Sequence, residues 1–103
     1  MSRGVLLVDD DASVRSAVAR YLRLKQWDVL EAADLREAGE RLRERRPDAA
    51  VVDYSLPDGS GLELVRRIHE LEPTVPIVVL TAHGSIDLAV AAVKEGAEQF
   101  FTK

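Results

Sequence analysis

Apolar and polar positions follow two different periods along this chain. Five short apolar runs occupy residues 4–8, 27–31, 49–53, 76–80 and 98–102. Runs of this length are typical of strands that are buried on both faces of a sheet. The second run is less apolar than the others, as expected for a strand near a sheet edge. The pattern therefore predicts five β-strands.

Between these runs, apolar residues recur at the spacing of a helix. The first helix should turn one set of side chains inward, since they are three and four residues apart: Val14, Ala17, Val18, Tyr21 and Leu22. Asp34 and Glu37 have the spacing of a capping residue and its partner, which predicts the start of a second helix.

A third helix is predicted to begin after Ser60, because Ser60 and Glu63 have the same capping spacing. It should bury four apolar side chains: Leu64, Val65, Ile68 and Leu71. A fourth helix is predicted between Ser85, its cap, and Gly96, where it should stop. Residues 54–61 contain one proline and two glycines, so they are predicted to form a loop.

Regular alternation of strands and helices predicts an α/β fold, with a parallel sheet and helices on both of its faces. A chain of 103 residues is long enough for one domain and too short for two. No fifth helix follows the last apolar run, so we expect one domain over residues 1–103 that is truncated after its fifth strand. The sheet should then expose apolar surface, which predicts a homodimer or larger species.

Composition narrows the class of protein. The chain is 47% apolar and 31% charged and has no cysteine, which indicates a globular protein without disulfides or thiolate metal sites. No apolar stretch approaches the roughly 18 residues of a membrane span, and we expect a cytoplasmic location. The net charge of −4 argues against direct nucleic-acid binding. The arginines of residues 41–46 alternate with glutamates, as on an ion-paired helix face.

Polar residues gather where the predicted strands end. Asp9 and Asp10 follow the first strand, Asp53 ends the third, Thr81 follows the fourth and Lys103 follows the fifth. In an open doubly wound sheet, ligands bind outside the carboxyl ends of the strands. We therefore expect these carboxylates, a hydroxyl and an ammonium group to share one small site.

Such a cluster has a specific chemistry. Neighbouring carboxylates repel one another unless a cation compensates their charge. Carboxylate oxygens suit Mg²⁺, which binds one or two protein carboxylates together with water and phosphate oxygens. With the metal bound, an ionised carboxylate can attack phosphorus and form an aspartyl phosphate. Asp11, in contrast, is predicted to cap the helix that follows it.

From about Val5 to Lys103, the chain resembles the receiver domain of bacterial two-component response regulators, in the CheY-like superfamily. The residues that carry the resemblance are Asp9-Asp10, Asp53, residues 56–61, Thr81-Ala82 and residues 101–103. The resemblance implies a flavodoxin-like, doubly wound, five-stranded parallel sheet with strand order 2-1-3-4-5. Residues 58–61 read Asp-Gly-Ser-Gly, where many members have a Gly-hydrophobic-Asp-Gly run.

The resemblance also implies a metal site. Asp53 would be the phosphoacceptor and part of the site for Mg²⁺ or Mn²⁺. Asp10 would ligate the metal directly, and Asp9 would hold it through water or help to ligate it. The backbone carbonyl of Ser55 would supply a further ligand.

Three later residues would take part once the phosphoryl group is attached. Thr81 would donate a hydrogen bond to it, Lys103 would pair with one of its oxygens, and Phe100 would be an aromatic switch. The phosphoryl donor would be a sensor histidine kinase, and the signal would pass to an output domain or partner protein that regulates transcription. Such a domain catalyses only its own phosphorylation and dephosphorylation.

Two other functions remain open on the sequence. Asp9-x-Asp11 resembles the nucleophile pair of haloacid-dehalogenase-type phosphatases, although those enzymes are normally longer and need a cap domain. A pseudo-receiver that binds partners without ever carrying phosphate is the other alternative. Its usual mark is the loss of an acceptor, acidic or lysine residue, and all of these are present here.

Overall fold

The computed structural model describes residues 3–82 and 93–102 of the chain. The strands are β1 (Arg3–Val8), β2 (Trp27–Ala32), β3 (Ala49–Asp53), β4 (Ser55–Leu56), β5 (Gly59–Ser60), β6 (Ile77–Thr81) and β7 (Gln99–Thr102). The helices are α1 (Ala12–Leu24), α2 (Leu35–Glu44) and α3 (Gly61–Leu71). The predicted helix that begins at Ser85 falls largely on residues 83–92, outside the described residues. Gly96, where this helix was predicted to stop, has a φ of 114°, a backbone conformation that favours glycine.

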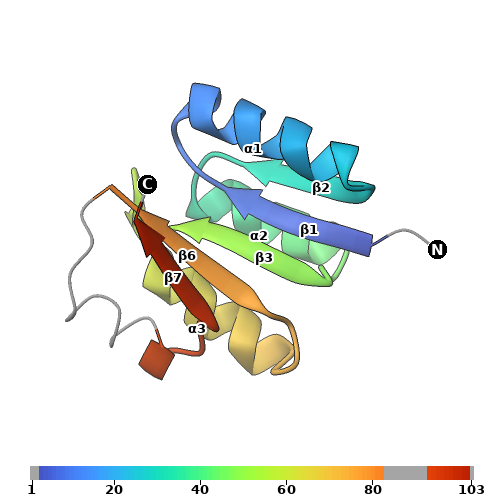
Figure 1. Cartoon of the computed structure of the whole chain (residues 1–103). Helices are drawn as coiled ribbons and strands as arrows, with labels where there is room; N and C mark the ends of the chain where they lie inside the picture. Colours follow the sequence, from blue (N-terminus) through green and yellow to red (C-terminus); the bar gives the residue numbers. More distant parts are fainter. Residues whose placement is uncertain (1–2, 83–92, 103) are drawn as a thin grey trace.

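Five parallel strands form the main sheet in the order β2-β1-β3-β6-β7. This confirms the predicted order 2-1-3-4-5, because β6 and β7 are the fourth and fifth of the predicted strands. Helix α1 lies on one face of the sheet, and α2 and α3 lie on the other (Figure 1). The fold is therefore doubly wound, with the carboxyl ends of β1, β3 and β6 at one edge.

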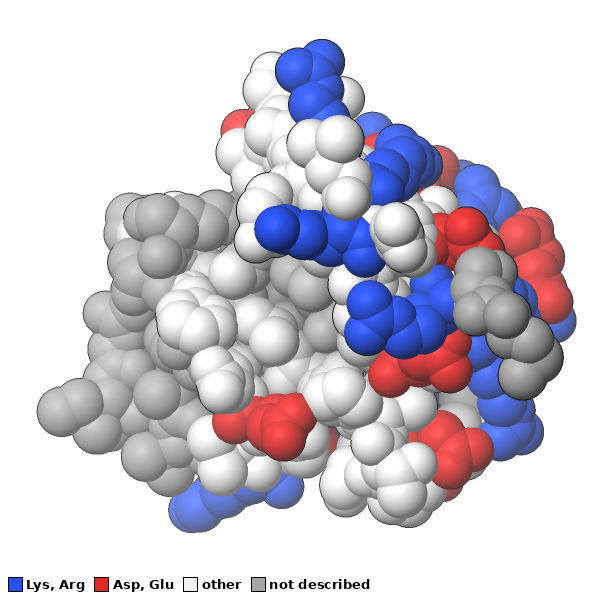
Figure 2. Space-filling view, turned by 45° about the vertical axis from the view of Figure 1, so that its right-hand side comes forward, with Lys and Arg blue, Asp and Glu red and all other residues white. Residues whose placement is uncertain are grey.

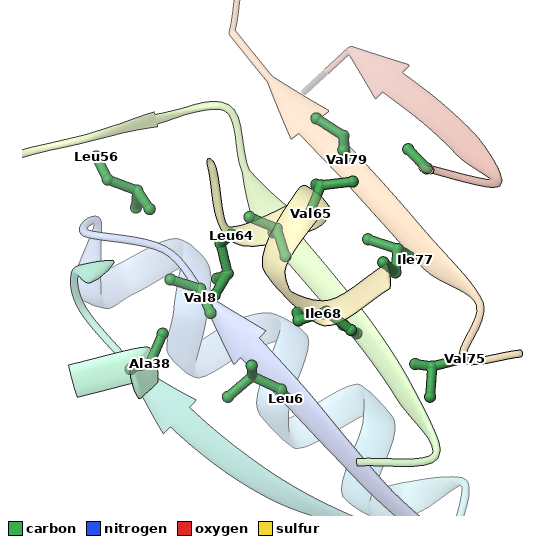
Figure 3. Close-up of a cluster of buried hydrophobic side chains, with 14 residues drawn as sticks. Leu6, Val8, Ala38, Leu56, Leu64, Val65, Ile68, Val75, Ile77 and Val79 are labelled. Carbon is green, nitrogen blue, oxygen red and sulfur yellow. The ribbon is translucent and has the colours of Figure 1, made fainter. Parts of the chain in front are cut away.

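The main core lies between the sheet and the α2/α3 layer. Alternate residues of β1, β3 and β6 meet the inner side of α3 (Figure 3), and the buried side chains include Leu6, Val8, Val52, Ile77, Val79, Leu64, Val65 and Ile68. Each of them is at most 2% exposed. Three of the four residues predicted on the inner side of the third helix are thus confirmed.

Leu71 is the exception, since it is 47% exposed. It is the last residue of α3 and lines an open groove of about 220 Å³ between α2 and α3. The helical period continues to Leu71, but no element of the described chain covers the helix at that point.

The opposite face is only half covered. Helix α1 lies over β1 and β2 (Figure 1), where Val5 and Leu7 are buried. Two residues predicted to face inward on this helix are exposed: Ala17, and Tyr21 at 60%. The prediction was wrong for them: on this face, no helix of the described chain lies over the neighbouring strands β3, β6 and β7 (Figure 1). We call this uncovered part of the sheet the open face.

Phe101 on β7 belongs to the open face and is 51% exposed. It pairs in register with Leu80 of β6, and both Leu80 and Val78 are only half-buried. Figure 2 shows largely uncharged surface between the grey segment and the Lys and Arg side chains. The predicted exposure of apolar surface is therefore present on this face.

The segment predicted as a loop contains a short antiparallel hairpin. Strands β4 and β5 pair Ser55 with Ser60 and Leu56 with Gly59. Pro57 and Asp58 form its turn, and Gly59, the next residue, has a φ of 152°, which a larger residue adopts only with strain. Leu56 is 8% exposed and anchors the hairpin in the core.

The caps predicted for α1, α2 and α3 are present, whereas the cap predicted at Ser85 lies outside the described residues. Asp11 accepts hydrogen bonds from the amides of Ser13 and Val14, at 2.9 and 3.1 Å. The Ser60 hydroxyl accepts one from the amide of Leu62 at 3.1 Å, and α3 starts at the next residue after Ser60.

Within the described residues, no helix is long and apolar enough to cross a membrane.

Candidate functional site

Three carboxylates meet at the carboxyl edge of the sheet. Asp9 and Asp10 follow β1, Asp53 ends β3, and one oxygen from each lies within 4.8 Å of the others. Asp9 and Asp53 are only 1% and 5% exposed, whereas Asp10 is open to solvent. The convergence predicted for these residues is therefore observed.

Asp9 is fixed through its backbone as well as its side chain. Its amide donates to the carbonyl of Ala32 at 3.1 Å, and its Oδ1 accepts from the amide of Asp11 at 3.0 Å. Arg15 on α1 donates from its guanidinium to the Asp9 carbonyl at 2.7 Å and pairs with Glu31 at 3.3 Å. These bonds hold the turn after β1 in one position. No pattern in the sequence indicated the role of Arg15, which lies between the apolar positions of its helix.

Asp53 is held by the segment that follows it. Its Oδ1 accepts a hydrogen bond from the amide of Ser55 at 3.3 Å, and the amide of Tyr54 donates to Leu80 of β6 at 2.7 Å. Gly61 packs against the carbonyl of Asp53 so closely that a Cβ at Gly61 would collide with that oxygen. The backbone around the acceptor carboxylate is thus tightly constrained.

Thr81 ends β6, beside β3, and is 4% exposed. Its neighbour Leu80 is the register partner of Asp53, so the hydroxyl group comes from the strand next to the carboxylates. In β7, the backbone of Phe100 pairs with Val79 of β6, but the Phe100 side chain and the whole of Lys103 lie outside the described residues. Their predicted roles therefore stay predictions.

The chemistry of the carboxylate group fits a hard divalent cation. Three carboxylates this close together repel one another, and an ion between them removes that repulsion. All the donors are oxygen atoms, which suits Mg²⁺, Mn²⁺ or Ca²⁺ better than a metal that prefers sulfur or nitrogen. The observed cluster can therefore bind a metal ion.

One further acidic residue lies in the hairpin that follows Asp53. Asp58 accepts hydrogen bonds from the amides of Leu35 and Arg36 at the start of α2, at 2.9 and 3.1 Å. The bond from the Leu35 amide is the main reason why the pKa of Asp58 lies below its ordinary value of 3.8. Residues 58–61 depart from the usual family sequence, but no local pattern indicates this contact, because its partners lie more than 20 residues away.

The family model for the response regulator receiver domain matches residues 5–103. The chain belongs to this family. The predicted family and the predicted flavodoxin-like architecture are thereby confirmed.

Known receiver-containing proteins resemble the chain over most of its length. It is 40% identical to the response regulator protein PilR of Pseudomonas aeruginosa over 98 residues, which are 95% of this chain and 22% of PilR. It is 35% identical to the phosphate regulon transcriptional regulatory protein PhoB of the same organism over 105 residues, 100% of this chain and 46% of PhoB. The chain thus spans less than half the length of either relative.

Solved structures agree with the receiver fold. A response regulator from Burkholderia pseudomallei, with a phosphorylated aspartic acid, calcium ion and citrate, has a TM-score of 0.93 and 32% identity. The match covers 99% of this chain and 60% of that one. The beryllofluoride-activated NtrC4 receiver domain dimer has a TM-score of 0.89 and 37% identity, with 97% and 83% of the two chains covered.

Proposed function

We propose that this receiver domain accepts a phosphoryl group on Asp53 in a reaction that requires Mg²⁺, and that it works as a signalling switch in the cytoplasm. The observation that carries the proposal is the convergence of Asp9, Asp10 and Asp53 within 4.8 Å at the carboxyl edge of the sheet. The calcium ion and phosphorylated aspartate named for the Burkholderia protein support it.

In the proposed reaction, a carboxylate oxygen of Asp53 attacks the phosphorus atom of the donor. The new bond joins that oxygen to phosphorus, and the bond from phosphorus to the donor breaks. With a phosphohistidine donor, the leaving imidazole takes up a proton. Asp10 and the carbonyl of Ser55 would ligate Mg²⁺ or Mn²⁺, and Asp9 would hold the ion through water or as a ligand. The ion supplies positive charge that offsets charge on the phosphoryl oxygens.

After transfer, Thr81 would donate a hydrogen bond to the phosphoryl group, and Lys103 would pair with one of its oxygens. Phe100 would then turn inward as Thr81 moves. The donor is proposed to be a sensor histidine kinase. The similarity to PhoB, a transcriptional regulatory protein, supports an output in transcription. This output would be delivered through another domain or a partner protein.

The direct test is incorporation of a phosphoryl group from acetyl phosphate, measured by intact-protein mass spectrometry. Wild-type protein should gain one phosphoryl group with Mg²⁺ present and none with excess chelator. The Asp53→Asn variant should gain none. Unchanged incorporation in Asp53→Asn would show that the acceptor assignment is wrong.

Asp11→Asn is the matched control, because Asp11 lies beside the cluster and its side chain caps α1 instead of facing the metal. Asparagine also caps helices well, so this variant should incorporate phosphate like the wild type. The same capping role argues against the phosphatase alternative, in which Asp11 would act on the substrate. Sustained hydrolysis of a phosphomonoester, lost in Asp9→Asn, would favour that alternative instead.

A pseudo-receiver is distinguished by metal binding. If calorimetric titration detected no Mg²⁺ binding at millimolar concentration, a module that never carries phosphate would replace the present proposal. We further propose that the open face supports self-association, since Phe101 exposes apolar surface there, and Tyr21 on α1 is also exposed. A molar mass by light scattering that stays monomeric at every concentration would refute this.

A further inference from the structure

The start of α2 has more amide groups than its own sequence can satisfy. The first amides of a helix have no partner within the helix and need an acceptor from elsewhere. The Asp34 side chain accepts from the amide of Glu37 at 2.8 Å, and Glu37 returns a bond to the amide of Ala33 at 2.8 Å. This reciprocal pair leaves the amides of Leu35 and Arg36 to be satisfied by a residue outside the segment.

Asp58 satisfies both amides with one carboxylate. Its Oδ1 accepts from Leu35 and its Oδ2 from Arg36, across separations of 23 and 22 residues in the sequence. The helix dipole favours a negative charge at this position. A carboxylate that uses both oxygens on adjacent amides is fixed in orientation, so the hairpin that carries Asp58 is fixed to α2.

A second contact joins the same two elements. A Cβ added to Gly59 would lie 2.7 Å from Cδ1 of Leu35, so the hairpin backbone already packs directly against that leucine side chain. Leu56, at the other side of the turn, is buried in the core. The turn of the hairpin is therefore held on two sides.

The hairpin also reaches the carboxylate cluster. Its first residue, Ser55, pairs with Ser60 and donates its amide to Oδ1 of Asp53. Pairing in β4 and β5 makes residues 55–60 one short unit, so a displacement of the turn at Asp58 would be passed to Ser55. The Ser55 carbonyl is the group assigned above as a metal ligand.

We infer that Asp58 is a positioning residue for the metal site: by binding the start of α2, it holds the β4–β5 hairpin so that the Ser55 carbonyl is preorganised for the metal ion. This inference rests on the proposed function. It also gives the acidic residue at position 58 a task that is separate from binding the metal itself.

The test measures the Kd for Mg²⁺ by calorimetry in wild type, Asp58→Ala and Asp58→Asn, together with phosphorylation by acetyl phosphate. Mutation of a residue that orients a metal ligand typically lowers metal affinity by about 10- to 100-fold. We therefore expect roughly tenfold weaker Mg²⁺ binding in Asp58→Ala. Asparagine keeps one acceptor oxygen, so Asp58→Asn should recover part of the loss. Phosphorylation at saturating Mg²⁺ should change less than phosphorylation at low Mg²⁺.

Two controls separate positioning from charge and from stability. Glu63→Gln removes a negative charge from the same region, since its carboxylate oxygens lie 3.5 Å from where a Cβ of Gly59 would be. Asp48→Asn alters another exposed carboxylate that accepts a backbone amide, that of Gly4, but at the opposite end of β1. Both variants should keep the wild-type Kd to within about twofold, because loss of charge alone is screened at the surface.

Wild-type Mg²⁺ affinity in Asp58→Ala would overturn the inference, even if the variant unfolds more easily, because Asp58 would then be only a helix cap. An equal loss of affinity in Glu63→Gln would overturn it too, since charge alone would explain the effect. A wild-type chain that binds no Mg²⁺ would overturn the proposed function and the inference together. Selective loss in Asp58→Ala with partial recovery in Asp58→Asn would support the inference.

Discussion

The two faces of the sheet are built from the same strands but are packed differently. On the face of α2 and α3, alternate residues such as Val79 are fully buried, and α3 fills the space above them. On the face of α1, the next residue of the same strand, Val78, is only half-buried. Phe101 on the neighbouring strand is 51% exposed.

The difference shows that the apolar sequence of a strand predicts burial but does not identify the element that covers the strand. Strand β6 is apolar on both sides because each side can pack against a layer of helices. In the described chain one side has such a layer and the other does not. We call the face that packs against α2 and α3 the closed face. It contains the main core, and we expect it to contribute more to stability than the open face.

Truncation on the closed face should have the largest effect. Ile68 of α3 is 2% exposed and packs in the main core. Ile68→Ala should lower the free energy of unfolding by about 2–5 kcal/mol, because it removes buried methylene groups and leaves a cavity. Urea denaturation measures the loss. A loss below about 1 kcal/mol would mean that the closed face is not the main core.

Adjacent valines on β6 allow the faces to be compared with identical chemistry. Val79→Ala on the closed face should cost about 2 kcal/mol, since two buried methyl groups and a cavity are involved. Val78→Ala on the open face should cost less than half as much, because water already reaches part of its surface. Equal losses in the two variants, measured by the same urea titration, would contradict the distinction between the faces.

The contact of Asp58 with α2 joins this helix to the hairpin beside the carboxylate cluster, and it should depend on pH. Its pKa is lowered in the folded state, chiefly by the Leu35 amide, so the ionised form stabilises the fold. This contribution is complete above the ordinary value of 3.8 and is lost as pH falls through the lower folded pKa. Asp58→Asn should therefore be less stable than wild type at pH 7, with a smaller difference near pH 2. A difference that grows on acidification would exclude this account.

Substitutions at Phe101 on the open face and at Tyr21 on α1 should have the smallest effect on stability and the clearest effect on association. Tyr21→Ser and Phe101→Ser, alone or together, should change the free energy of unfolding by about 0.5 kcal/mol or less, as at other exposed positions. They should also shift light-scattering masses toward monomer. Leu71→Ser is the control, because Leu71 is similarly exposed, at 47%, and lies on α3. An equal shift in this control would place the association surface elsewhere.

The sequence by itself determined the alternation of strands and helices, the strand order through the family resemblance, and the positions of Asp9, Asp10 and Asp53 at strand ends. The alternation and the strand-end positions are local features, because burial imposes a period on each element and a strand delivers its next residue to the sheet edge. The strand order is not local and came from the resemblance alone. Even the Asp11 cap could be predicted, because an acidic residue just before a helix commonly caps it.

Only the tertiary structure decided which surfaces and partners these elements meet. Tyr21 has the spacing of a buried residue and is 60% exposed, because periodicity gives the apolar side of a helix and not the width of the layer beneath it. Asp58 finds its partner amides 22 and 23 residues away in the sequence, and Arg15 reaches a carbonyl across a turn. Such contacts depend on how separate elements pack, which no local pattern records.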